Sequence, residues 1–291
     1  MAKKIGLRFF LSSLYQKQLR PVYARRWHTW SKKTRKFLIF SEEKPKNYPL
    51  PTHLHLRLNY EFVLESQPVN EENILILASN SPRRKQLLSL GGWAFKVAVT
   101  DIDESQRLGE APGAYVLRLA ESKARKSAEN ANVNNIVIAA DTSVVDGNDI
   151  LGKPVDSEDA VRMLKRLRGH THQVYTGLAL LRVSDGKVLT DLSVTDVPMR
   201  DYSDDEIDAY VKTGDPLDKA GSYAIQHQGF HPVKSIMGCF ASVMGLPLCR
   251  LTYLLQQFKI SPKSAVDMHC QTELQYDCSI SHAILHGELV N

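Results

Sequence analysis

The sequence predicts a layered domain of mixed α-helices and β-strands, and three observations support this class. Short runs rich in β-branched residues alternate with amphipathic helical segments between residues 74 and 258, as expected for strands and helices packed in layers. Turn sequences at residues 146–148 and 184–187 join neighbouring strand candidates, so the sheet should be mixed rather than purely parallel. A hydrophobic content of 43% with 24% charged residues is ordinary for a soluble globular protein with a core.

The elements follow in chain order. Strands are expected at residues 74–78, 95–100, 136–140, 143–145 with 150–151, 174–183 and 188–197, and helices at 82–90, 112–130, 157–168 and 203–212. Ser81 is a suitable N-cap for the first helix, and Pro82 fits its first turn because no amide is needed there. Gly169 ends the third helix, whereas Ser203 and Glu206 form a capping box at the start of the fourth.

The two ends of the chain differ in composition from its middle. Residues 1–41 contain 11 of the 37 Lys and Arg residues and none of the 32 Asp and Glu residues, which leaves a net charge of −6 over residues 42–291. An acidic balance removes the electrostatic signature of nucleic-acid binding from the main domain. We therefore divide the chain into a basic N-terminal extension and linker (1–70), a folded domain (71–260) and a polar C-terminal tail (261–291).

The N-terminal segment resembles a mitochondrial transit peptide. It is rich in Lys and Arg, and Leu7, Phe10, Leu11 and Leu14 recur at helical spacing. A disordered basic extension or a misassigned start codon would give the same composition. Since no apolar run approaches the length that spans a bilayer, we expect no membrane association. The expected location is the cytoplasm, with the mitochondrion as the alternative.

All four cysteines lie in the last quarter of the chain, and none forms a closely spaced pair. A disulfide framework is therefore not expected, which fits a reducing compartment. In the tail, Cys270, Cys278, His282 and His286 do not match the common spacings of zinc sites. We expect a poorly ordered polar tail rather than a metal-binding knot.

A candidate phosphate cradle lies at residues 75–84, which read Leu-Ile-Leu-Ala-Ser-Asn-Ser-Pro-Arg-Arg. A short buried strand ends there in two hydroxyls, Ser79 and Ser81, and two guanidiniums, Arg83 and Arg84, at the start of a helix. Free amides at a helix N-terminus and forked guanidinium donors both suit phosphate oxygens. The alternative is a capped helix with solvated arginines.

Charged residues also lie at other element ends. Asp141 directly follows the apolar run 136–140, at the carboxyl end of a buried strand, where open α/β sheets bind ligands. It is a candidate metal ligand or general base, or else the cap of the following turn. Lys123 falls on the inward stripe of the second helix, where it either contacts a phosphate or extends to solvent.

Three more charged residues complete the set. Lys153 lies between Gly152 and Pro154 after a hairpin, while Asp103 and Glu104 follow the strand-like stretch 95–100. Each alone would be an ordinary loop residue. Cations and acids that emerge together from separate strand and helix ends predict one site for a metal-bound polyphosphate.

Several short sequence blocks, in the same order along the chain, match the pattern of a known protein family. They are Leu-Ala-Ser-Asn-Ser-Pro-Arg-Arg (77–84), Glu-Ser-Lys-Ala (121–124), Ala-Asp-Thr-Ser-Val-Val (140–145) with Leu-Gly-Lys-Pro (151–154), His-Gln-Val-Tyr-Thr-Gly (172–177), Asp-Pro-Leu-Asp-Lys-Ala-Gly-Ser-Tyr-Ala-Ile-Gln (215–226) and Val-Met-Gly-Leu-Pro-Leu (243–248). On these blocks, the chain from about residue 74 to 258 resembles the Maf family of nucleoside triphosphate pyrophosphatases. The resemblance does not extend to either end of the chain.

The resemblance implies a fold and a reaction. The fold would be an elongated mixed sheet flanked by helices, with two lobes around a central cleft. The reaction would be hydrolysis of a nucleoside triphosphate to the monophosphate and pyrophosphate with Mg or Mn, as sanitation of the nucleotide pool. Phosphate binding would fall to Ser79, Ser81, Arg83, Arg84, Lys123 and Lys153, metal binding to Glu104 and Asp141, and the role of general base to Asp141.

The resemblance also bears on base choice. Arg83, Thr142 and Gln226 match the branch that acts on dTTP and UTP, where a glutamine amide can pair with a pyrimidine edge. The chain departs from the family pattern in Asp215, His227 and Cys239-Phe240. A side chain at residue 227 replaces the usual glycine, so we expect it to alter the backbone path there.

Two other functions remain open from sequence. The chain could be a catalytically weak nucleotide-binding regulator of cell division, although Asp141, Lys123 and Lys153 are intact. It could instead bind nucleic acid through its basic N-terminus. A standard P-loop NTPase is excluded because no Gly-x-x-x-x-Gly-Lys-Ser/Thr occurs. We expect a homodimer with a nucleoside triphosphate substrate as its partner.

Overall fold

The computed structural model describes residues 28–32, 35–39 and 74–288. The chain separates into two compact units, Met1–Glu65 and Ser66–Asn291, which are treated separately. The first contains an antiparallel hairpin of β1 (His28–Lys32) and β2 (Arg35–Ile39), which the sequence analysis did not predict. Most of the expected transit segment and all of the expected linker lie outside the described residues.

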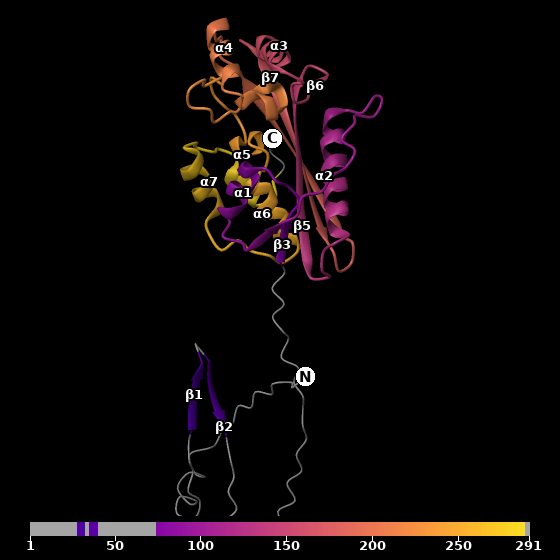
Figure 1. Cartoon of the computed structure of the whole chain (residues 1–291), viewed down its shortest axis with the longest axis vertical. Helices are drawn as coiled ribbons and strands as arrows, with labels where there is room; N and C mark the ends of the chain where they lie inside the picture. The colour runs from indigo at the N-terminus through magenta and orange to yellow at the C-terminus, as the bar shows by residue number, and fades with distance from the viewer. Residues whose placement is uncertain (1–27, 33–34, 40–73, 289–291) are drawn as a thin grey trace, which may run out of the picture. The chain divides into compact units, whose positions relative to one another are not determined.

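The second unit is built on a six-stranded mixed sheet (Figure 1). Its strands are β3 (Ile74–Leu77), β4 (Phe95–Val97), β5 (Asn135–Asp146), β6 (Asp149–Leu151), β7 (Thr171–Arg182) and β8 (Val188–Pro198). Their order is β4-β3-β5-β7-β8, with β6 paired to β5. Because β3 runs parallel to β4 and β5 while the other pairs are antiparallel, the predicted mixed sheet is confirmed.

Two long strands form the centre of the sheet. The predicted strands 136–140 and 143–145 are one continuous strand, β5, which pairs with β7 from Ile136↔Arg182 to Val145↔Gln173. Both expected hairpins are present, with Gly147 and Gly186 in the left-handed conformation that such tight turns require. The prediction of a break in the strand after residue 140 is wrong, because β5 is continuous from Asn135 to Asp146.

The helices are α1 (Pro82–Ser89), α2 (Pro112–Ala128), α3 (Ser157–Leu167), α4 (Asp204–Lys212), α5 (Phe240–Val243), α6 (Leu248–Gln257), α7 (Val266–Leu274) and α8 (Ser281–Leu285). Single 3-10 turns cover Asp215–Asp218 and Ala220–Ser222. The four predicted helices are confirmed, including the Ser81 cap of α1 and the Ser203–Glu206 capping box of α4. Sequence reasoning missed α5 to α8. No helix in the described ranges is long and apolar enough to cross a membrane.

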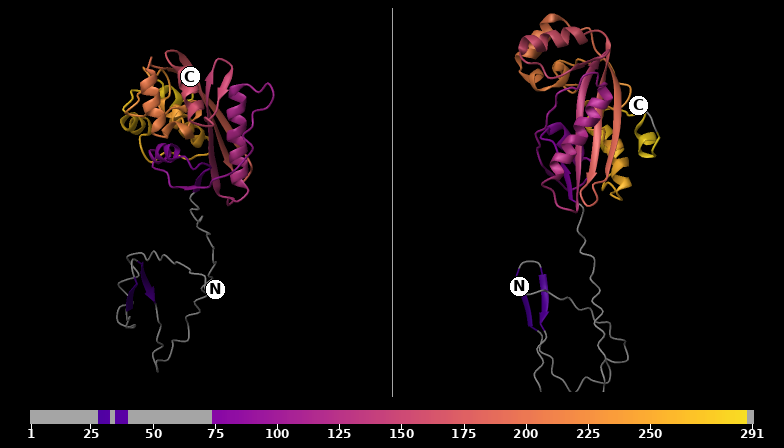
Figure 2. Two further views of the ribbon diagram at one scale, coloured as in Figure 1. Left: turned by 45° about the horizontal axis from the view of Figure 1, so that its top comes forward. Right: turned by 90° about the vertical axis from the view of Figure 1, so that its right-hand side faces the viewer.

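Helices cover both faces of the sheet (Figures 1 and 2). On one face α2 packs its alanines and Val116 against β5 and β7, and Gly177 permits the close approach because a Cβ there would lie 2.6 Å from the Val116 carbonyl oxygen. On the other face α1 and α6 pack on the same strands around Leu87, Leu178 and Leu251. The far ends of β5, β7 and β8 extend beyond these helices and form a separate cluster with α3 and α4.

The C-terminal tail is folded, contrary to the expectation of poor order. Val266 of α7 and Ile284 of α8 are buried, and both helices contact α6. The segment before them is fixed by Lys263, whose amide donates to the Gly91 carbonyl, and by the Trp93 indole, which donates to the Ser261 carbonyl. Although the tail is polar in composition, Val266 and Ile284 give it a small apolar surface that is buried in the fold.

Candidate active site

A cleft of about 850 Å³ is lined by the middle of β5, the turn from β3 into α1, part of α2 and the loops around residues 218–226 and 243–245. A volume of this size accommodates a nucleotide-sized ligand. The predicted site residues all line it, namely Ser79, Ser81, Arg83, Arg84, Glu104, Lys123, Asp141, Thr142, Lys153 and Gln226. They come from segments up to about 150 residues apart, so the fold brings together what the sequence separates.

The centre of the cleft is one lysine between two carboxylates. Lys123 of α2 places its Nζ 2.6 Å from Asp141 Oδ1 and 2.7 Å from Glu104 Oε1. The Lys123 and Asp141 side chains are largely buried, whereas the Glu104 side chain is 55% exposed. Lys123 therefore neither extends into open solvent nor is free for phosphate in this state. The second oxygen of Asp141, Oδ2, accepts no hydrogen bond from the described residues.

Asp141 lies in the middle of β5 and not at its carboxyl end, which corrects the sequence prediction. The position is nevertheless open, because the parallel neighbour β3 pairs only as far as Leu77↔Ile138 and then turns into α1. Beyond that point β5 has no partner on this side until β6 begins at its far end. The gap left by β3 exposes residues 141 and 142 to the cleft.

Glu104 reaches the site from an irregular segment between β4 and α2. Burial works to raise the pKa of its carboxyl, but the hydrogen bond and charge of Lys123, with the charges of Lys153 and Arg84, lower that pKa below its ordinary value. The carboxylate form is therefore favoured at neutral pH. An ionised carboxylate is a ligand that a divalent cation can use once other negative charge offsets these neighbouring cations.

Arg84 is fixed by three hydrogen bonds. Its Nε donates to the Gly245 carbonyl at 2.8 Å, Nη1 to Ser79 Oγ at 3.3 Å and Nη2 to Thr142 Oγ1 at 3.2 Å. Burial lowers the pKa of Arg84, against the opposing charge of Asp141, yet a guanidinium stays charged at physiological pH. Three of its five N–H groups are used, so two remain for a ligand.

The hydroxyl of Thr142 belongs to this arrangement. Thr176 donates to the Ser242 carbonyl at 2.8 Å, so its oxygen must accept the hydrogen of Thr142, 3.0 Å away. Thr142 in turn accepts from Arg84. Its single hydrogen is thus directed into the protein, away from a bound base.

The remaining phosphate candidates keep hydrogen-bond donors that no described residue uses. Ser79 accepts from the Ser81 amide and from Arg84, and Ser81 accepts from the Arg84 amide, but neither hydroxyl donates to a described residue. Arg83 and Lys153 form no hydrogen bond or ion pair with the part of the chain that the structure describes. The cleft therefore presents two hydroxyl hydrogens and two cationic side chains to an anion.

The opposite wall carries Gln226, which is exposed and whose amide bonds to no described residue. The wall is held by a buried network in which Tyr210 donates to Asp215 at 2.7 Å and accepts from the Ala224 amide at 3.0 Å. Lys219, 8% exposed, donates to Asp215 and Asp218. Asp215 thus performs a structural task. The sequence analysis assigned no role to Tyr210, which lies in the predicted helix 203–212, or to Lys219, which lies in the sequence block 215–226.

His227 has a backbone conformation that is open to any residue. Its φ is not among the positive values of the described residues, so no glycine-like freedom is needed there. Its Nδ1 accepts from the Phe230 amide at 2.9 Å, and its ring packs against Tyr210 with centroids 4.6 Å apart. The ring therefore packs on the wall outside the residues that line the cleft.

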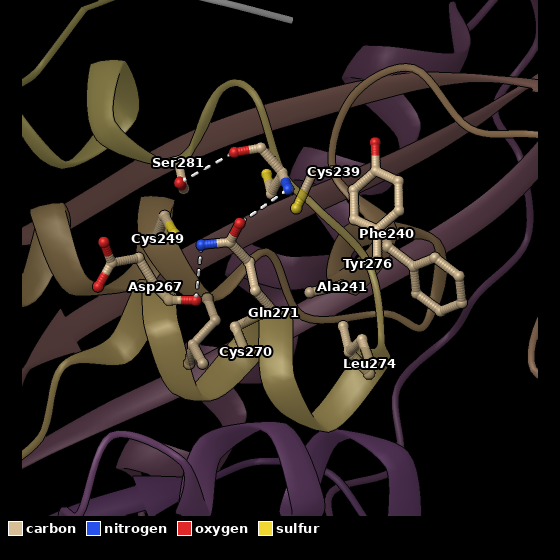
Figure 3. A pocket seen from close by; sticks show the side chains of 12 residues that line it. Cys239, Phe240, Ala241, Cys249, Asp267, Cys270, Gln271, Leu274, Tyr276 and Ser281 are labelled. Atoms are coloured by element: carbon tan, nitrogen blue, oxygen red, sulfur yellow. Dashed lines mark hydrogen bonds between the residues drawn. The ribbon is translucent and has the colours of Figure 1, made fainter.

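Cys239 and Phe240 line a second, small pocket of about 10 Å³ (Figure 3). All four cysteines meet around it, and each is a free thiol. Within the described ranges no three His, Cys, Asp or Glu side chains are placed to hold a metal. The Cys239-Phe240 departure therefore does not touch the cleft directly.

Comparison with known proteins assigns the chain to a group. The model of the family described as Maf-like protein matches residues 74–258. A dTTP/UTP pyrophosphatase of Acetivibrio thermocellus is 45% identical over 193 residues, covering 64% of this chain and 96% of that protein. One of Dictyoglomus turgidum is 47% identical over 190 residues, with coverages of 64% and 97%. Among solved structures, the Staphylococcus aureus Ham1 protein is 14% identical with a TM-score of 0.37, covering 70% of this chain and 96% of that one.

Proposed function

Because the chain belongs to the Maf-like protein family, we propose that its cleft hydrolyses dTTP and UTP to the monophosphate and pyrophosphate. The relatives that are 45% and 47% identical over 193 and 190 residues are dTTP/UTP pyrophosphatases, and the segment matched by the family model contains every described residue that lines the cleft. The reaction is attack of water on the α-phosphorus with departure of the β- and γ-phosphates. It requires neutralisation of charge on the triphosphate more than covalent help.

The observation that carries the proposal is the set of unused donors in the cleft. Arg83 and Lys153 have no acidic partner among the described residues, and Arg84 keeps two N–H groups beyond those that fix it. With the hydroxyls of Ser79 and Ser81, they offer donors to several phosphate oxygens at once. Among the described residues, five Lys and Arg side chains and three Asp and Glu side chains line the cleft, and this excess of positive charge favours a polyphosphate over a neutral ligand.

Asp141 is the proposed base for the attacking water. Lys123 occupies its Oδ1, which fixes the carboxylate and leaves Oδ2 to accept a proton. A general base must lie within hydrogen-bond reach of the proton that it takes. The opening left beside β5 provides room for a water at Oδ2.

A divalent cation fits the same place. Mg²⁺ is commonly held by one or two carboxylates together with substrate phosphates, and Asp141 and Glu104 converge on the single ammonium of Lys123. Mg or Mn bound there would neutralise phosphate charge and activate water. Lys123 would then be released from at least one carboxylate and become available to the phosphates.

Base choice is assigned to Gln226. Its amide lines the cleft and is not committed elsewhere, so it can both donate to and accept from a pyrimidine edge. Thr142, which sequence reasoning grouped with Gln226 and Arg83, has its hydrogen directed to Thr176. We therefore assign Thr142 to fixing Arg84 rather than to reading the base.

A nucleotide panel with pyrophosphate detection tests these assignments. Wild-type protein should hydrolyse dTTP and UTP well above ATP and GTP, by about 10-fold or more, because the Gln226 amide loses its hydrogen-bond partner when a bound purine covers it, which costs about 1 to 3 kcal/mol. Gln226→Glu should reduce dTTP and UTP turnover more than residual purine turnover. Thr142→Val should reduce all substrates alike, and Thr142→Ser should restore them.

Two results would contradict the proposal at different levels. Equal rates on all nucleotides before and after the Gln226 change would remove the base assignment and leave the reaction class intact. No pyrophosphate from any triphosphate in the presence of Mg or Mn would remove the reaction itself.

A further inference from the structure

The segment that carries Glu104 has no secondary structure of its own. From Ala98 to Ala111 the chain contains neither helix nor strand, and Glu104 is its only member that touches the catalytic lysine. Irregular segments hold a side chain in place only when other contacts fix their backbone. The question is what fixes this one.

Two side chains of α2 fix two consecutive peptide groups of this segment, 104–105 and 105–106. The Tyr115 hydroxyl donates to the Glu104 carbonyl at 2.8 Å, and Arg118 Nη2 donates to the Ser105 carbonyl at 3.0 Å. Lys123, further along the same helix, holds the Glu104 carboxylate itself. One helix therefore binds both the backbone and the side chain of this residue.

Arg118 is itself fixed by Glu110 near the end of the segment. Its Nε lies 2.5 Å from Glu110 Oε1 and its Nη2 lies 2.7 Å from Oε2, a bidentate pair. The pair is shielded, with side-chain exposures of 18% for Arg118 and 9% for Glu110. Glu110 Oε2 also accepts from the Arg107 amide, which closes the segment onto itself.

The backbone contacts matter most when substrate arrives. A triphosphate brings negative charge to Lys123, Lys153 and Arg84, the same cations that favour the Glu104 carboxylate. The phosphates then compete with the Glu104 carboxylate for Lys123. This contact is more exposed than the contact between Lys123 and Asp141. Hydrogen bonds to backbone carbonyls do not compete with phosphate, so they persist.

We propose that Arg118, with Glu110, is a positioning pair that keeps Glu104 at the reaction centre while phosphates occupy the surrounding cations. The proposal rests on the proposed function for its catalytic consequence. Neither Arg118 nor Glu110 lines the cleft, so the pair acts on catalysis only through the segment that it holds. Tyr115 contributes to the same task but also lines the cleft, which makes it less suitable as a test.

The test compares Arg118→Gln, Glu104→Gln and the double variant. Arg118→Gln should lower kcat on dTTP about 10-fold with little change in KM, the range found when a group that orients a ligand is removed. Because Arg118 acts through Glu104, the double variant should be no slower than Glu104→Gln alone. Arg118→Lys should recover activity only partly, since an ammonium cannot make the bidentate pair.

Arg125→Gln is the matched control. Arg125 lies on the same helix and pairs with Glu121, but the pair is exposed, and neither side chain forms a hydrogen bond or ion pair with residues 98–111. It should keep wild-type kcat. Hydrogen exchange without nucleotide supplies a second readout, in which Arg118→Gln and Glu110→Gln should speed exchange at residues 98–111 and Arg125→Gln should not.

Distinct outcomes separate the two proposals. Multiplicative losses in the double variant, or unchanged exchange at residues 98–111, would overturn the positioning role of Arg118. An inactive wild-type protein would overturn the proposed function, and the exchange data would still report whether Arg118 holds the segment. If Arg118→Gln does not fold, Glu110→Gln carries the same comparison.

Discussion

Asp141 shows how a single residue acquires a function from its neighbours. On β5 it lies among buried apolar residues, where an unpaired carboxylate would be costly, and Lys123 offsets that cost at 2.6 Å. The same contact leaves Oδ2 without a partner among the described residues. A carboxylate that is anchored through one oxygen and unpartnered at the other is placed for proton transfer.

Asp141→Asn should lower turnover by about 100-fold or more, the range for loss of a general base or metal ligand. The amide oxygen can still accept from Lys123, so folding and nucleotide binding should persist. Steady-state rates on dTTP and a thermal melt check this. Asp146→Asn is the matched control, because Asp146 ends the same strand but pairs with Arg166 near the surface. Near wild-type turnover in Asp141→Asn would contradict the assignment.

At the scale of single residues, sequence reasoning located the cleft well. Each candidate had a local signal, such as hydroxyls and arginines after a strand or an acid after an apolar run, and all of them except Asp103 line the cleft. The Asp103 carboxylate instead accepts a hydrogen bond from the Ser105 amide. The sequence could not predict which of these side chains form hydrogen bonds with one another. Thr142 and Ser242 are 100 positions apart, and only the folded chain links them through Thr176.

The elements were predicted where their apolar pattern has a period. The helices α2, α3 and α4 each present one buried stripe, and α3 and α4 are also capped by a side chain next to them in the sequence. In contrast, α6 was missed because it is buried almost all round, including Arg250 and Thr252, so no polar face marks its period. The short α5 has too few residues to show one, and α7 buries only Val266.

The strand β7 carries a prediction about pH. His172 is 2% exposed, its Nε2 lies 2.8 Å from the Tyr223 hydroxyl, and Nδ1 has no partner among the described residues. Burial lowers the pKa of His172 to about 4. Because the unfolded chain binds a proton near pH 6.5 and the folded chain does not, the neutral ring stabilises the fold above pH 6.5 and this contribution is lost as the pH falls through 4.

Chemical unfolding at pH 7 and pH 4 measures this effect. Wild-type protein should lose up to about 3 kcal/mol more stability between these values than His172→Gln, whose amide can still bond to Tyr223 but does not titrate. His231→Gln, an exposed position, should behave as wild type. An identical pH dependence in wild type and His172→Gln would show that His172 is protonated in the folded state.

For the molecule as a whole, the N-terminal unit and the C-terminal tail are expected to differ in their importance for stability. The described residues that line the cleft lie between Ala78 and Gly245, within the unit Ser66–Asn291. None of the described residues beyond 260 lines it, but Val266 and Ile284 of this tail are buried.

Two truncations should therefore differ. Deleting residues 1–65 should leave kcat on dTTP and the melting temperature near those of the full chain, because the described cleft residues and the buried core residues all belong to the second unit. Deleting residues 262–291 should lower stability by at least about 3 kcal/mol, since it exposes the surface that α7 and α8 cover and removes the hydrogen bond from Lys263 to Gly91. Thermal melts with rate measurements on both variants check this. Loss of folding after the first deletion would mean that the N-terminal residues belong to the catalytic domain, and an unchanged melt after the second would mean that the tail only rests on it.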